Sequence, residues 1–268
     1  MKLRLSRKIS LALEDLIAAS KAWHVWYILG ISELRQRYRR STIGPFWVTI
    51  SMAVQALVMG FVLSFLFKTD VTRYLPFICI SLIVWNFFSN SIIEGSSSLI
   101  SMSGVILQIK RPYSVYIMLV LWRNALIFAH TVIVFFIAAV IFKMYPNFTY
   151  FFVPFGLGLF LLNVSWMVLA AALLSARFRD VPLMIQNAFS ILVWLTPVYY
   201  LPEQLGPRAR MIIELNPLTY VIEVARGPFL NQPPSETAWL VSLGLAVAGW
   251  VITFALFVRT RSRIAYWL

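Results

Sequence analysis

Long apolar stretches separated by short polar segments dominate the pattern along this chain. Six of them come close to or exceed the roughly 20 residues that a helix needs to cross a bilayer. They cover residues 46–67, 75–93, 124–142, 150–174, 183–201 and 238–258. Hydrophobic residues make up 60% of the chain and charged residues only 12%, about half the charged share of a soluble domain. We therefore predict an all-α integral membrane protein with six transmembrane helices.

The distribution of basic residues predicts the orientation of these spans. Six spans place both termini on one side, which carries 16 Lys and Arg residues against six on the opposite side. Because Lys and Arg accumulate in cytoplasmic loops, both termini are predicted to be cytoplasmic. The same rule accounts for the net charge of +13, so membrane lipids are expected as partners and nucleic acid is not.

Residues 1–45 are predicted to form a cytoplasmic and interfacial segment ahead of a transmembrane domain over residues 46–268. A helical apolar face in this segment is formed by Ile9, Leu13, Leu16, Ile17 and Ser20. Lys8, Asp15 and Lys21 are expected to turn away from that face. This pattern is typical of an amphipathic helix that lies in the membrane interface. It serves as a surface anchor or, alternatively, as a collar around a transport path.

A cluster of arginines precedes the first span in the stretch ELRQRYRRSTIGPFWVTI, residues 33–50. Its members are Arg35, Arg37, Arg39 and Arg40. Next to a transmembrane helix, such a cluster is expected to contact the anionic inner leaflet.

The segment between the second and third spans, residues 94–112, has the composition of a short amphipathic helix. Its apolar positions are Leu99, Ile100, Met102, Val105 and Ile106. Apolar side chains offered to the cytoplasm favour a protein partner, although an ordinary connector is the alternative interpretation.

The longest polar segment, residues 202–237, lies before the last span. Two short helical stretches, RMIIEL and LTYVIEVAR, are separated by Asn216 and Pro217. We predict a helical hairpin that re-enters the outer half of the bilayer, where its backbone must be buried in protein or line a cavity. Glu214, Glu223 and Arg226 would then lie close together, either as a structural ion pair or as part of a gate.

Several catalytic chemistries find no support in the sequence. There is no Gly-Lys dipeptide and therefore no P-loop. Two histidines and one cysteine form no recognisable zinc site, and no nucleophile elbow is present. The chain is predicted to be no enzyme and to hold no metal or cofactor, with a membrane-embedded enzyme of envelope assembly as the less favoured alternative.

Polar and aromatic residues within the spans suggest a transport path. The candidates are Ser51 and Gln55 in the first span, Trp85 and Phe88 in the second, and Asn187, Ser190 and Trp194 in the fifth. Polar groups inside a membrane usually face the interior of a bundle, and aromatic rings beside hydroxyls and amides suit sugars. Helix packing and interfacial belts are the alternative. No predicted span contains an acidic residue, which favours an external energy source over ion coupling.

Three motifs in order carry a family resemblance: RQRYRRSTIGPFW before the first span, ARFRDVP after the fourth, and LNPLTYVIEVAR in the hairpin. Together they resemble the membrane subunits of bacterial ABC-2-type polysaccharide exporters over residues 30–268. The similarity is greatest to O-antigen export permeases, with capsule and teichoic-acid permeases near. A permease of this fold for a small amphipathic drug or lipid is the alternative.

This resemblance implies a multi-pass protein of the bacterial inner membrane that works as a homodimer with a channel between protomers. It implies two copies of a cytoplasmic P-loop ATPase, which would hold the ATP and magnesium, and a lipid-linked glycan as cargo. Residues 8–25 would be the interface helix, residues 96–110 the helix that couples to the ATPase, and residues 203–232 the outer gate. The arginines of residues 35–40 gain a second possible role in binding the pyrophosphate of the lipid-linked glycan.

Overall fold

The computed structural model describes residues 2–37, 39, 43–44 and 46–268, and every regular element in these residues is a helix. Within these residues, five helical segments are long and apolar enough to cross a membrane. The helices that form them are α3 (Phe46–Phe67), α4 (Val71–Ser101), α6 (Ser114–Ile141), α7 (Val153–Arg177) and α11 (Glu236–Thr260). The predicted all-helical membrane fold is therefore confirmed.

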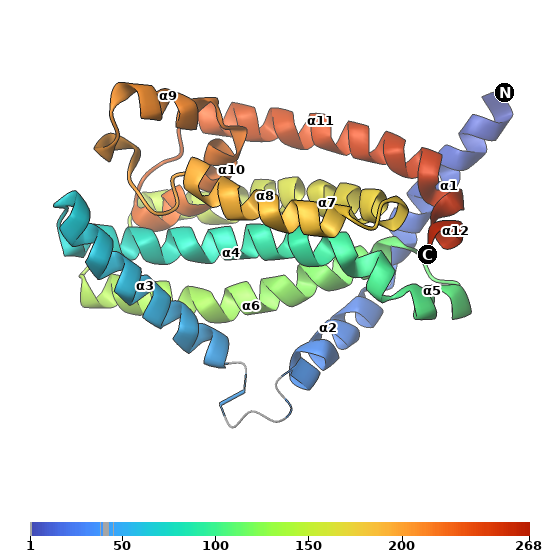
Figure 1. Ribbon diagram of the computed structural model, residues 1–268, viewed down its shortest axis with the longest axis horizontal. Coiled ribbons are helices and arrows are strands. Elements are labelled where there is room, and N and C mark those ends of the chain that lie inside the picture. Colours follow the sequence, from blue (N-terminus) through green and yellow to red (C-terminus); the bar gives the residue numbers. More distant parts are fainter. Residues whose placement is uncertain (1, 38, 40–42, 45) are drawn as a thin grey trace.

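The remaining α-helices in the described residues are shorter. They are α1 (Lys2–Lys21), α2 (Trp23–Arg37), α5 (Ser103–Gln108), α8 (Val181–Leu195), α9 (Pro207–Leu215), α10 (Pro217–Arg226) and α12 (Ile264–Trp267). Four 3-10 helices join them: η1 (Phe148–Phe152), η2 (Pro202–Gln204), η3 (Gly227–Leu230) and η4 (Arg261–Arg263). Figure 1 shows both termini and α5 at one end of the bundle, which we call the termini end, and α9 at the opposite, hairpin end.

α4 lies in the middle of the bundle and packs against α3, α6, α7, α8 and α10 (Figure 1). Most of the α4 side chains from Tyr74 to Phe88 are buried. At its first turn, the Asp70 carboxylate accepts a hydrogen bond from the backbone N–H of Thr72 at 3.0 Å, which lowers the pKa of Asp70 and caps the helix.

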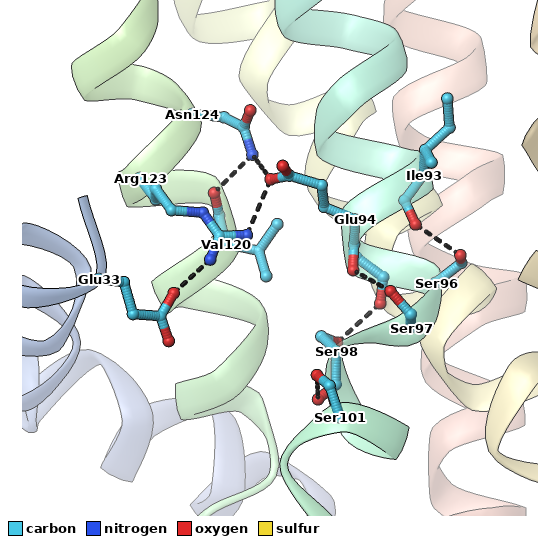
Figure 2. Close-up of polar contacts among 11 residues, drawn as sticks. Glu33, Ile93, Glu94, Ser96, Ser97, Ser98, Ser101, Val120, Arg123 and Asn124 are labelled. Atoms are coloured by element: carbon cyan, nitrogen blue, oxygen red, sulfur yellow. Dashed lines mark hydrogen bonds and ion pairs between the residues drawn. The ribbon is translucent and has the colours of Figure 1, made fainter. Parts of the chain in front are cut away.

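The helices differ from the predicted spans mainly at their ends. α3 coincides with the predicted first span, but α4 continues to Ser101 where the prediction ended at residue 93. The polar run after residue 93 suggested a loop. In the structure its serines fold back onto the helix, as in the 2.7 Å bond from Ser98 Oγ to the Gly95 carbonyl (Figure 2). The loop that contains α5 is correspondingly shorter than predicted.

The predicted fifth span corresponds to α8, which has only 15 residues and ends at Leu195 instead of residue 201. At 1.5 Å per residue it is about 22 Å long, short of the roughly 30 Å hydrocarbon core. The chain leaves the helix at Thr196 because Pro197 follows, and a proline disfavours helical geometry in the residue before it.

The N-terminal segment forms two helices, with a break at Ala22 between α1 and α2. On α1, the predicted apolar face is largely exposed, with Leu13 and Ile17 turned away from the protein. Ala12, Asp15 and Ala19 face the protein instead. The prediction that Asp15 lies on the polar side of the helix, away from the apolar face, placed this residue in solvent and is wrong: Asp15 is buried, with 3% of its surface exposed.

Candidate functional site

Four polar side chains from three helices meet at the termini end of the bundle (Figure 2). The Arg123 guanidinium on α6 pairs with Glu33 on α2 and, at 2.8 Å, with Glu94 on α4. Asn124 adds a hydrogen bond of 2.9 Å to the same Glu94 oxygen. Trp122 packs its ring 5.8 Å from Trp26 beside this group. The network therefore holds α2 against the two helices that flank α5.

A second polar group ties α1 to the same region. The buried Asp15 carboxylate accepts hydrogen bonds from the backbone N–H groups of Tyr113 and Ser114 at 3.3 and 3.0 Å. It also pairs with Arg261 at 3.0 Å. Because these N–H groups open α6, Asp15 acts as a helix cap supplied by a distant helix, with its negative charge at the positive end of the dipole. α1, α6 and the C-terminal segment meet at this carboxylate.

α5 connects α4 to α6 and projects from the termini end of the bundle (Figure 1). Of the residues predicted to contact an ATPase, Leu99 and Ile106 are buried, Ile100 and Met102 are partly buried, and Val105 is exposed. Leu107 and Ile109 are also exposed and were not among the predicted contacts. The short amphipathic helix predicted here is present, and an apolar edge of it remains open to a partner.

The described arginines of the cluster lie in the last turn of α2 and just beyond it. The side chain of Arg35 is exposed on α2, Arg37 is the last residue of that helix, and Arg39 is exposed beyond it. Arg40 lies outside the residues that the structure describes.

At the hairpin end, side chains of α10 and its N-cap bond to the chain where α8 ends. The Arg226 side chain, in a residue with 6% of its surface exposed, donates to the Pro197 carbonyl just beyond α8. It also donates to Ser81 Oγ on α4 at 2.9 Å and lies over the Phe77 ring, 4.6 Å from its centroid. A carbonyl freed by ending a helix is costly in a membrane unless a protein donor satisfies it.

The other hairpin residues form separate contacts. Asn216 donates to Thr196 Oγ1 at 3.1 Å and caps α10, whose first residue is Pro217. Glu214 pairs with Arg210 on the exposed α9, and Glu223 accepts from the backbone N–H of Ser235. The two helices divided at Asn216 are therefore as predicted. The predicted ion pair is not found: among the described contacts, Arg226 bonds to neutral oxygens.

The candidate path residues fall into two groups. Ser51 and Gln55 on α3 are exposed, as are Asn187, Ser190 and Trp194 on α8, the last with 65% of its surface exposed. Both helices pack on α4 and turn these residues outward. Trp85 and Phe88 are different because they are buried in α4, where both rings contact Phe189. In the protomer they belong to the core.

Sequence reasoning did not assign roles to Asp15, Glu33, Glu94 or Asn124. The sequence did offer one signal for the three carboxylates: a carboxylate within an apolar or amphipathic segment requires a partner when it is buried. Within the described part of the chain, no group of three or more His, Cys, Asp or Glu residues is arranged to hold a metal.

Comparison with known proteins identifies the family. Residues 24–230 match the family model described as ABC-2 type transporter. A protein of Klebsiella pneumoniae named O-antigen export system permease protein RfbA is 22% identical over 240 residues, which cover 87% of this chain and 90% of that protein. A second Klebsiella protein of that name is 23% identical over 74% of this chain and 77% of its own length.

A Myxococcus xanthus protein of the same name is 21% identical over 79% of this chain and 82% of that protein. The match to the family model includes α3, α4, α6, α7, α8 and α10, and therefore both ends of the bundle described above. The chain belongs to the ABC-2 type transporter family and is a transporter membrane subunit, and this family implies an ABC ATPase subunit as its partner.

Proposed function

We propose that this permease exports a lipid-linked polysaccharide, of the O-antigen type, across the bacterial inner membrane. The observation that carries the proposal is that the three relatives, each aligned over most of both chains, are all named O-antigen export permeases. The chain would hold no cofactor itself, and the ATP and magnesium would be bound by two copies of a cytoplasmic ATPase.

In the proposed topology α3, α4, α6, α7, α8 and α11 are six spans and the termini end is cytoplasmic. The excess of Lys and Arg at that end supports this orientation. α9 and α10 would form the outer gate, re-entering the membrane to cover the interrupted end of α8. Asn216 donates to the Leu195 carbonyl and Arg226 to the Pro197 carbonyl, which supports such an entry, since irregular backbone in a membrane requires protein partners.

Exposed polar residues on α3 and α8 support a homodimer. Gln55 and Asn187 lie within the apolar helices α3 and α8 and are uncovered in the protomer. Polar side chains facing lipid are unfavourable, so a second protomer that turns these faces toward a shared channel would remove the penalty. Trp194, with its ring 5.1 Å from Tyr199, would offer a stacking surface for sugars along that channel.

Coupling to the ATPase would pass through α5 and the adjoining end of α4. The predicted contacts are Leu99, Ile100, Met102, Val105 and Ile106, of which Val105 is the most accessible. Arg35, Arg37, Arg39 and Arg40 would meet the pyrophosphate of the cargo at the inner leaflet. A movement of α5 would reach α1 and α2 through Asp15 and Arg123, because Asp15 bonds to the start of α6 and Arg123 pairs with Glu94 on α4.

Depletion of the chain tests the proposal. Envelope sugars are radiolabelled, and surface polymer is compared with lipid-linked polymer on the inner leaflet. We expect surface polymer to fall while the inner lipid-linked form accumulates, and the carrier lipid then distinguishes O-antigen from capsule or teichoic acid. Unchanged glycan on both sides would refute polysaccharide export and favour a small amphipathic cargo.

The path is tested by replacing its most exposed aromatic residue. Trp194→Ala is expected to slow export with little effect on stability, because its ring is mostly uncovered in the protomer. Phe155→Ala, at an aromatic position on α7 that is also more than half exposed, serves as the control. Export that is unchanged in Trp194→Ala, or reduced equally in both variants, would remove Trp194 from the path.

A further inference from the structure

Two adjoining cavities open between helices near the hairpin end. The larger, about 480 Å³, lies among α3, α4 and α6 and is lined almost wholly by apolar side chains, including Ala53, Leu75 and Ile137. The smaller, about 300 Å³, is more polar and includes Thr72, Arg73 and Gln232. Phe142 lines both cavities, so its ring lies between them. An apolar chamber beside a polar one has the polarity of a lipid tail and headgroup.

The two helices that flank the apolar cavity end in the same unusual way. α3 is followed by Lys68 at φ 51° and α6 by Phe142 and then Lys143 at φ 53°. Thr69 N–H bonds to the Ser64 carbonyl at 3.0 Å, and Met144 N–H bonds to the Ala139 carbonyl at 2.8 Å. Both ends are therefore Schellman motifs with lysine in the left-handed position.

Glycine or asparagine normally occupies that position, because a side chain disfavours the left-handed conformation. The remaining non-glycine residue with positive φ among those described is Asn231, a residue type that tolerates it. Lys68 and Lys143 are thus both disfavoured by their left-handed backbone conformation. Their positive charge does complement the negative end of the helix dipole. A negatively charged ligand at this end of the bundle would account for both lysines.

The charges around the polar cavity favour an anion. Lys143 lies between two residues that line it, Phe142 and Met144, and Arg73 lies in its wall. Two carboxylates, Asp70 and Glu203, lie close to these groups, and both have partners: Glu203 pairs with Arg73 at 3.2 Å, and Asp70 accepts from a backbone N–H. Lys68, Lys143 and Arg73 therefore outnumber these two carboxylates.

We propose that these cavities form a binding site for an anionic phospholipid of the leaflet at the hairpin end. One acyl chain occupies the apolar cavity between α3 and α6, and the phosphate lies at Lys143 and Arg73. Such a lipid would fill the space beside α3 and hold this helix in place against α6. The proposal concerns a resident lipid and is independent of the exported cargo.

The test is lipid binding by the full-length chain in detergent, followed by native mass spectrometry. Palmitoyl-oleoyl phosphatidylglycerol is titrated against the phosphatidylethanolamine with the same acyl chains. Lys143→Gly removes the charge while suiting the left-handed backbone, so the fold is retained. We expect it to weaken phosphatidylglycerol binding about fivefold, the loss typical of one cation near an anionic headgroup, and Lys68→Gly to add to this loss.

Two further variants make the outcome specific. Lys110→Gly removes an exposed lysine from the irregular segment after α5 and should leave binding unchanged. Ala53→Phe, which fills the apolar cavity, should weaken binding of both lipids. Equal affinity for the two lipids in the wild type, or equal effects of Lys143→Gly and Lys110→Gly, would overturn the proposal. Retention of a polyprenyl diphosphate that Ala53→Phe abolishes would also overturn it, because the occupant would then be cargo.

Discussion

Replacement of Arg123 by methionine is the most informative perturbation of the termini end. Methionine keeps much of the length and apolar stem of arginine but leaves Glu33 and Glu94 without their shared cation. The three side chains are only 13, 23 and 26% exposed, so water compensates poorly for the lost partner. The fold itself should persist, because Trp26 and Tyr27 still pack on Trp122.

The expected loss follows from the burial of the two carboxylates. Removing one member of a buried ion pair typically costs about 3–5 kcal/mol, since the remaining charge stays desolvated. Because both glutamates keep some exposure, we expect a value near the lower limit, about 3 kcal/mol. Replacing all three charges, in the triple variant with Glu33→Gln, Arg123→Met and Glu94→Gln, also removes the two negative charges that Arg123 neutralised and should restore stability to within about 1 kcal/mol of the wild type.

Unfolding of the purified chain in detergent measures both variants. Arg210→Met is the matched control, because the Arg210–Glu214 pair is more than half exposed and should contribute at most about 0.5 kcal/mol. A single variant as stable as the wild type would refute the role of charge pairing at this site. A triple variant as unstable as the single one would show that packing of the Arg123 stem, and not its charge, holds α2.

Three other substitutions test the remaining contacts. In a thermal unfolding assay, Gly156→Ala should destabilise the chain by about 1–3 kcal/mol, because its Cβ would lie 2.2 Å from a backbone oxygen of α10. Gly158→Ala on the same helix has open space around its Cβ and should be neutral or stabilising in this assay. Asp15→Ala should expose α1 to limited proteolysis, whereas Glu14→Ala next to it should not; equal cleavage of the two would refute the cap. Arg226→Met should cost about 2–4 kcal/mol through the carbonyl left without its donor, and a stability equal to that of the wild type would contradict the contact described here.

The bundle itself was predictable from the sequence because bilayer thickness imposes one length on every apolar helix. α3 matches its predicted span for this reason, since charge or proline bounds it on both sides. Where polar residues continued a helix the prediction failed, as in the serine-rich end of α4. Serine bonds to its own helix as readily as to water, so polarity alone did not mark the helix end.

The polar contacts at the two ends were less predictable. Arg226 was recognised as partly shielded, but its partners Pro197 and Ser81 lie 29 and 145 residues away in sequence, and no local pattern relates them. The same holds for Asp15, whose helical position suggested exposure. Its burial depends on how α1 packs against α6, a tertiary contact that periodicity within one helix does not encode.

ATP-dependent transport in inverted membrane vesicles is the most direct test of polysaccharide export. Vesicles that contain the chain and its ATPase are loaded with radiolabelled lipid-linked polymer on the outer surface, which corresponds to the cytoplasmic leaflet. We predict that ATP moves the polymer into the lumen, where added glycosidase no longer degrades it, and that vesicles lacking the chain show no such protection. Polymer that stays degradable with ATP, or is protected equally without the chain, would contradict the proposed function.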